Sequence, residues 1–340
     1  MDPLTHALSS FALQRGFFSR AGRGVIFGVL IAGTISDLDW FTAALGPSSY
    51  FALHRTITHS LAGCLVLAMV AALLADVLAK KIGDSAATAR TSLVLLFVAA
   101  LASSLLHLLL DLCQADGVAL LWPFSPRRFA LDLLPGLDLW LLVLFALAIL
   151  LPELFRLVSD EIGARAKRPR GRNGAIIGFV LALAYLGMRT LFHGNVVATL
   201  NAHTIAGEVP RRVAAFPDSS SPFLWHAIVE TERSLHLVTE RNSGGEVTDA
   251  SYMTTLRKPE PSEFLQNAQK SPAAVAFLKA ARFPKATVQK ETDGYAVEIV
   301  DLKNQASGDM GRAILVDINL DPAAKVRSSE LQWQKAGPVR

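Results

Sequence analysis

The sequence predicts an all-α, multi-pass transmembrane helical bundle of about five spans, followed by a small α+β soluble domain. Of the 340 residues, 51% are hydrophobic and only 18% are charged, which is too apolar for an ordinary soluble protein. The apolar residues concentrate before about Phe192, and the rest of the chain has the composition of a soluble domain. We therefore divide the chain into a transmembrane domain, residues 1–192, and a soluble domain, residues 193–340.

Five apolar segments in the first domain are about 20 residues long, enough to cross the roughly 30 Å hydrocarbon core of a bilayer. Aspartates and histidines interrupt the first and the third of them, so we expect these two helices to lie inside the bundle rather than to face lipid. The predicted spans are residues 25–45, 61–79, 93–112, 133–151 and 174–192.

The loop charges predict an orientation in the membrane. Twelve Lys and Arg residues fall in the loops on one side of the five spans, against three on the other side. This excess places the N-terminus in the cytoplasm and, after five crossings, the C-terminal domain outside. The whole net charge of +4 lies in the membrane half, as orientation requires, so we expect no nucleic-acid partner.

The soluble half has short runs of β-branched and aromatic residues between turn signals such as NSGG and TDG. The runs LWHAIVET, SLHLVTER, YAVEIVD and AILVDINL predict strands, and residues 262–281 have the spacing of a helix. We expect about seven strands. Both cysteines, Cys64 and Cys113, lie in apolar segments, where we expect them to pack without forming a disulfide.

Several histidines and aspartates lie inside or beside the apolar segments. Inserting an Asp at the centre of a membrane helix costs roughly 2.5–3.5 kcal/mol of free energy on insertion scales, so such residues need a compensating partner. The predicted topology brings most of them to the outer ends of the spans, and we infer that the partner is a metal ion. Asp138 either joins this group or orients one of its ligands. The candidate ligands are His6, Asp37, Asp39, His54, His59, His107 and Asp111.

The motif HLLLD is the strongest local indication of a metal site. On a helix, His107 and Asp111 share one face at a separation of about 6 Å, which allows both to bind one ion or an ion pair. The alternative is a hydrogen bond between the two side chains inside the bundle.

The motifs HRTITHS and SDLDW each contain two candidates. His54 and His59 are five residues apart, so we expect His54 in a loop and His59 at the start of a helix. Asp37 and Asp39 point some 200 degrees apart on a regular helix, and both reach one site only if the helix breaks near Gly33. A proton relay is the alternative role for these acids.

Two further groups bear on chemistry. The adjacent Arg127 and Arg128 carry forked donors that suit phosphate or carboxylate oxygens, although contact with lipid headgroups explains them equally well. His6 is a candidate ligand only because other candidates accompany it. To reach them at the outer face from a cytoplasmic N-terminus, its segment must re-enter the membrane. The four histidines of the soluble half lack ligand spacing, so we expect structural or exposed roles for His193, His203, His226 and His236.

Five motifs, DPLTHAL, SDLDW, HRTITHS, HLLLDL and PFSPRR, follow one another in the first 130 residues. In this order they resemble the LexA-regulated, membrane-bound metal-dependent hydrolase family (YdjM-like), and the soluble half resembles the longer members of that family. The family is distantly similar to the zinc-dependent phospholipase C and P1 nuclease group, all-helical phosphoesterases whose metals are held by His and Asp. The resemblance implies metal ligands at the matching positions, which are His107 with Asp111, His6, Asp37 or Asp39, and His59.

This chain departs from that distant group in two ways. It has no N-terminal Trp ligand, and no further set of His, His and Glu follows Asp111 in the membrane half. One or two ions are therefore expected rather than three, with zinc favoured by the imidazoles and manganese or iron also compatible.

The predicted function is hydrolysis of a phosphoester or related ester, such as that of a lipid, by metal-activated water at the outer face of the bacterial cytoplasmic (inner) membrane. An Asp of the 37/39 pair acts at the metal, and Arg127 or Arg128 steadies the anionic substrate. Two alternatives stay open: an ion- or proton-coupled transporter, and a membrane-anchored binding module with an external recognition domain. The sequence predicts the bilayer as a partner and leaves the oligomeric state undetermined.

Overall fold

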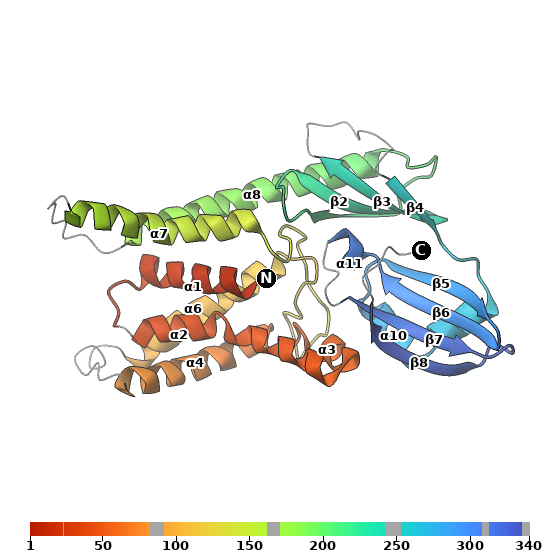
Figure 1. Ribbon diagram of the computed structural model, residues 1–340, viewed down its shortest axis with the longest axis horizontal. Coiled ribbons are helices and arrows are strands. Elements are labelled where there is room, and N and C mark those ends of the chain that lie inside the picture. The colour runs from red at the N-terminus through yellow and green to blue at the C-terminus, as the bar shows by residue number, and fades with distance from the viewer. Residues whose placement is uncertain (23, 82–91, 162–170, 242–252, 308–312, 335–340) are drawn as a thin grey trace. The chain divides into compact units, whose positions relative to one another are not determined.

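A computed structural model describes residues 1–22, 24–81, 92–161, 171–241, 253–307 and 313–334 (Figure 1). The chain forms two compact units: residues 1–41 and 53–189 make the first, and residues 42–52 and 190–340 make the second. The first is helical, and the second holds two four-stranded antiparallel sheets with short helices. The predicted fold class is confirmed.

Five helical segments of the described chain are long and apolar enough to cross a membrane. They confirm the predicted number of spans. Two bounds were wrong, because the fourth helix begins at Leu139 rather than at residue 133 and the fifth extends to Ala202. The segments are α2 with η1 (Gly24–Leu45), α4 (Leu61–Lys81), α6 (Leu93–Leu112), Leu139–Val158 of α7 (Leu139–Glu161) and α8 (Arg172–Ala202).

The first span is broken in the middle. Its α-helix α2 (Gly24–Ala32) ends before Gly33, and a 3-10 helix, η1 (Ile35–Leu45), continues it. Gly33 packs so closely on two neighbouring helices that an added Cβ would overlap the Ser10 hydroxyl and lie 2.8 Å from Ser103 Oγ. The break falls near Gly33, and the change of helix type alters the directions of the acidic side chains that follow.

Replacing Gly33 with alanine should destabilise the first unit by about 1–3 kcal/mol, because the extra methyl group forces the packed helices apart. Thermal unfolding in detergent would measure the loss. Gly28→Ala, in the preceding helix α2, is the matched control, since its Cβ would meet Ala75 Cβ at an ordinary 3.4 Å. Equal unfolding temperatures for the two variants would contradict the predicted close packing.

The first helix, α1 (Pro3–Phe17), crosses the unit beside α2, α6 and α7. Asp2 caps its start by accepting a hydrogen bond from the Thr5 backbone N–H at 2.8 Å. His6 stacks on the ring of His107 near the end of α6, whereas the Gly16 carbonyl accepts a hydrogen bond from Arg172 at the start of α8. Residue 6 therefore lies at the same end of the unit as His107, and α1 brings these two candidate ligands together.

The second unit contains two antiparallel sheets, each with its strands in chain order. All four strand runs identified in the sequence are strands, and the described residues hold eight strands rather than seven. The first sheet comprises β1 (Arg212–Pro217), β2 (Leu224–Glu230), β3 (Ser234–Arg241) and β4 (Met253–Arg257). The second comprises β5 (Pro284–Glu291), β6 (Gly294–Asp301), β7 (Ile314–Leu320) and β8 (Val326–Trp333).

The predicted single helix over residues 262–281 is two helices, α9 (Glu263–Gln269) and α10 (Pro272–Ala280). Pro272 lacks the N–H that would continue α9, so a new helix starts there. A helix of four residues, α11 (Lys303–Ala306), follows β6.

A short segment from the first third of the chain also belongs to the second unit. It includes most of α3 (Pro47–Leu53), whose Tyr50 and Phe51 pack into the core of the second sheet. The ring of Tyr50 lies 5.3 Å from that of Trp333, and the ring of Phe51 lies 5.8 Å from that of Phe277.

Some sequence expectations lie outside the described residues. They concern half of the twelve loop cations and one turn signal, namely Arg23, Arg90, Arg165, Lys167, Arg168, Arg170 and the NSGG turn at residues 242–245.

Candidate metal centre

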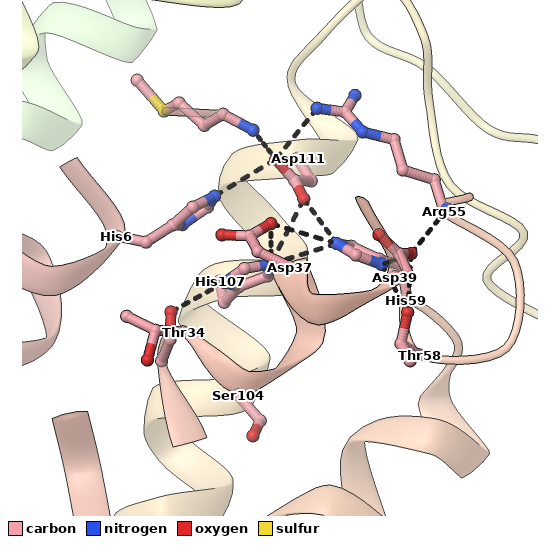
Figure 2. A network of polar contacts seen from close by, with 12 residues as sticks. His6, Thr34, Asp37, Asp39, Arg55, Thr58, His59, Ser104, His107 and Asp111 are labelled. Carbon is pink, nitrogen blue, oxygen red and sulfur yellow. Dashed lines mark hydrogen bonds and ion pairs between the residues drawn. The ribbon is translucent and has the colours of Figure 1, made fainter. Parts of the chain in front are cut away.

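Buried His and Asp side chains from four parts of the first unit meet at one place (Figure 2). α1 supplies His6, η1 supplies Asp37, and α6 supplies both His107 and Asp111. Each of these four residues offers one ligand atom, and the four atoms lie within 4.8 Å of one another. His59, just before α4, points into the same group.

The ring nitrogens of His59 and His107 stand at the centre of the group. Their Nε2 atoms are 3.1 Å apart, and Asp111 Oδ2 lies 3.0 Å from the first and 3.3 Å from the second. Asp37 Oδ1 lies 3.7 Å from His59 Nε2 and 3.6 Å from His107 Nε2. Ligands that share one tetrahedral zinc ion at 2.0–2.2 Å stand roughly 3.3 Å apart. The observed spacings therefore match a shared ion.

Hydrogen bonds fix which nitrogen of each ring faces the centre. His107 Nδ1 donates to the Gly33 carbonyl at 2.8 Å, which the end of α2 exposes. His59 Nδ1 lies 3.0 Å from Asp39 Oδ2, and that carboxylate can only accept. When both rings are neutral, the two Nε2 atoms turn lone pairs toward each other, and a positive charge between them, a metal ion or a proton, satisfies both.

The structure separates the roles of the two aspartates of η1. Asp37 faces the cluster, whereas Asp39 accepts hydrogen bonds from the groups that surround His59. Asp39 Oδ1 lies 2.8 Å from His54 Nδ1, and Asp39 Oδ2 lies 2.8 Å from both the Arg55 backbone nitrogen and Thr58 Oγ1. Asp39 thus orients His59, and the structure pairs His54 with Asp39 at the edge of the cluster.

Charge around the cluster favours a cation. Burial alone lowers the pKa of His59, but the carboxylates of Asp111, Asp37 and Asp39 outweigh burial and raise the pKa to about 10. Burial, together with the charge of His107, lowers the pKa of His6 to about 3. His6 is therefore neutral and can offer a lone pair, while the carboxylates around His59 favour a positive charge there, which a bound metal ion would supply in place of a proton.

Unsatisfied buried atoms give an independent test of whether a metal fits. Within the described residues, His6 Nδ1 and Asp37 Oδ2 are buried and form no hydrogen bond. Leaving such groups unpaired costs about 1–3 kcal/mol each, and a bound ion is one way to satisfy nearby donors of this type. The residues present fit a divalent cation with mixed nitrogen and oxygen ligands.

Other sequence candidates lie elsewhere. Asp138 caps α7 through the Leu141 backbone N–H at 2.9 Å and accepts a hydrogen bond from the Tyr185 hydroxyl at 2.8 Å, so it neither joins the cluster nor contacts a ligand in the described contacts. Arg127 lies over the ring of Phe129, and Arg128 donates to the His54 carbonyl at 2.8 Å. Their assignment to substrate binding stays a prediction.

Sequence reasoning missed Arg55. Its side chain is buried beside Asp111, whereas the loop charges predict for it only a role in orientation, as one of the three cations on the outer side. Its position next to His54 in the HRTITHS motif was the available signal. Ser60 caps the start of α4, since its hydroxyl accepts a hydrogen bond from the Gly63 backbone N–H at 2.9 Å.

Together, fold and site define a multi-pass membrane protein with a buried His/Asp cluster that can hold a metal ion. The family model described as YdjM inner membrane protein matches residues 1–196 of the chain. The chain therefore belongs to the YdjM family, a family of membrane metal-dependent hydrolases located in the inner membrane. Neither the search of curated proteins nor that of solved structures gave a match.

Proposed function

We propose that this protein is a metal-dependent hydrolase that cleaves a phosphoester or related ester, such as that of a membrane lipid. The observation that carries the proposal is the pair of imidazole Nε2 atoms 3.1 Å apart, each with its other nitrogen already engaged. Two carboxylates adjoin the same point. Family membership and placement in a bilayer support the choice of a hydrolase with access to lipid.

We assign His59, His107, Asp37 and Asp111 as ligands of one ion. His6 Nε2 lies 3.3 Å from Asp111 Oδ1, which the Met1 amino group also contacts, so His6 is a candidate ligand for a second ion. The imidazoles favour zinc over manganese or iron. When bound, a divalent cation would supply Lewis-acid chemistry, polarising the ester and making water acidic enough to attack near neutral pH. The protein orients the ligands through Asp39 and the Gly33 carbonyl.

Metal content tests this proposal directly. Purified wild-type protein should carry at least one equivalent of zinc by elemental analysis and hydrolyse a chromogenic phosphodiester, whereas His107→Ala should lose both. His203→Ala is the control, since His203 is exposed and bonds only within its own helix in the described contacts. A wild type with no more metal than His107→Ala would contradict the proposal and favour a transporter.

We further propose that the cluster faces the outside of the cell. Arg15 and Arg172 lie at the opposite end of the first unit from His107, where the positive-inside rule places the cytoplasm. A reporter that folds only outside the cytoplasm, fused after Arg340, should then be active. Activity only from a cytoplasmic reporter at that position would reverse the orientation.

A further inference from the structure

Arg55 places a guanidinium beside the ligand set. Its Nη2 lies 3.6 Å from Asp111 Oδ1, the oxygen that also contacts the Met1 amino group, whereas Asp111 Oδ2 faces His59 and His107. The side chain is about nine-tenths buried. A positive charge at such a distance from a ligand weakens binding of a cation, so metal affinity alone does not account for it.

The backbone of Arg55 shows that its position is held firmly. It adopts a φ of +56°, a left-handed conformation that costs a non-glycine residue of order 1 kcal/mol or more. Its N–H donates to Asp39 Oδ2 at 2.8 Å, and its carbonyl accepts from the Ala119 N–H at 3.1 Å. The strained turn therefore directs the side chain toward Asp111.

The guanidinium is fixed by a neutral partner more closely than by its acidic neighbours. Nη2 donates to Gln114 Oε1 at 2.5 Å, whereas the distances to Asp111 and Asp116 are 3.6 and 3.7 Å. Gln114 is itself held by the Pro135 carbonyl at 3.2 Å. The longer separations are those of ion pairs rather than of closed hydrogen bonds.

We propose that Arg55 is the residue that binds the anionic group of the substrate at the metal centre. This inference rests on the proposed function and specifies an anionic ester such as a phosphoester. A cation and a guanidinium on either side of Asp111 form a two-part receptor for an oxyanion, and the planar fork of arginine suits phosphate oxygens. Arg55, rather than Arg127 or Arg128, then selects for negative charge.

Inorganic phosphate is the probe for this assignment, titrated by calorimetry into the full-length, metal-loaded protein in detergent. Arg55→Gln should keep its metal, or bind it more tightly, while its affinity for phosphate falls about 10- to 100-fold, the range for a hydrogen bond to a charged group. Arg55→Lys should fall between the two, because it keeps the charge but loses the fork. Arg327→Gln, an exposed residue of β8, controls for general charge.

The results of these titrations distinguish an error in the Arg55 assignment from an error in the proposed function. Unchanged phosphate affinity in Arg55→Gln, or a larger loss in Arg127→Gln or Arg128→Gln, would overturn the assignment. Loss of metal from both Arg55 variants would also overturn it, because Arg55 would then act by positioning Asp111. A wild type without metal would instead refute the proposed function, and the phosphate titration of wild type against Arg55→Gln would still test Arg55 on its own.

Discussion

Asp111→Asn should empty the metal centre and reduce hydrolysis on the order of 100-fold or more, since a ligand is lost rather than a supporting group. Asp111 is fully buried and adjoins His59, His107 and His6 at 3.0 to 3.3 Å. Asparagine keeps the size but removes the charge and one acceptor oxygen, so its amide hydrogens would face groups that need an acceptor. Elemental analysis and turnover of a phosphodiester would measure both effects.

Asp76→Asn is the matched control for this experiment. Asp76 also lies in an apolar helix and has an i,i+4 partner, Lys80, at 2.5 Å, but this pair is partly exposed. The control should keep its metal and its activity. If Asp111→Asn retained stoichiometric metal, the ligand assignment for α6 would be wrong even if activity fell.

Asp39→Asn should weaken metal binding about 10- to 100-fold without removing a ligand, the range known for partners that orient metal-binding histidines. Asp39 receives contacts from His54, Thr58, His59 and the Arg55 backbone, all within 3.0 Å. Asparagine offers one acceptor oxygen in place of two, so His59 would lose the bond that fixes its ring. Competition with a chelator of known affinity would give the change in Kd.

Thr58→Val provides a graded comparison, because it removes one of these contacts and leaves the carboxylate in place. Its effect on the metal Kd should be smaller than that of Asp39→Asn. A larger effect for Thr58→Val, or a complete loss of metal in Asp39→Asn, would indicate that Asp39 does not act through His59.

The sequence predicted the parts of the site that depend on regular geometry. His107 and Asp111 fall on one helix face because residues four apart always do, and the structure keeps that pair together. The spans were recognisable because membrane crossing demands about 20 apolar residues. The strand runs of the second unit were recognisable because alternating β-branched residues fit a half-buried sheet.

The rest depended on backbone irregularities that periodicity does not encode. The roles of Asp37 and Asp39 follow from a 3-10 segment after Gly33, and the direction of Arg55 follows from a left-handed residue. The path of α1 could not be predicted because its 15 residues are too few and too polar to be counted as a span. It nevertheless places His6 against His107.

The segment 42–52 has a consequence for anyone who wishes to produce the second unit by itself. A fragment starting after Arg189 would omit Tyr50 and Phe51, and the surfaces of Phe277 and Trp333 that they cover would meet water. Such a fragment would be prone to aggregation, because the apolar surface that residues 42–52 normally cover would be exposed. Supplying residues 42–52 through a designed linker, rather than moving the start site, is the way to obtain a soluble piece.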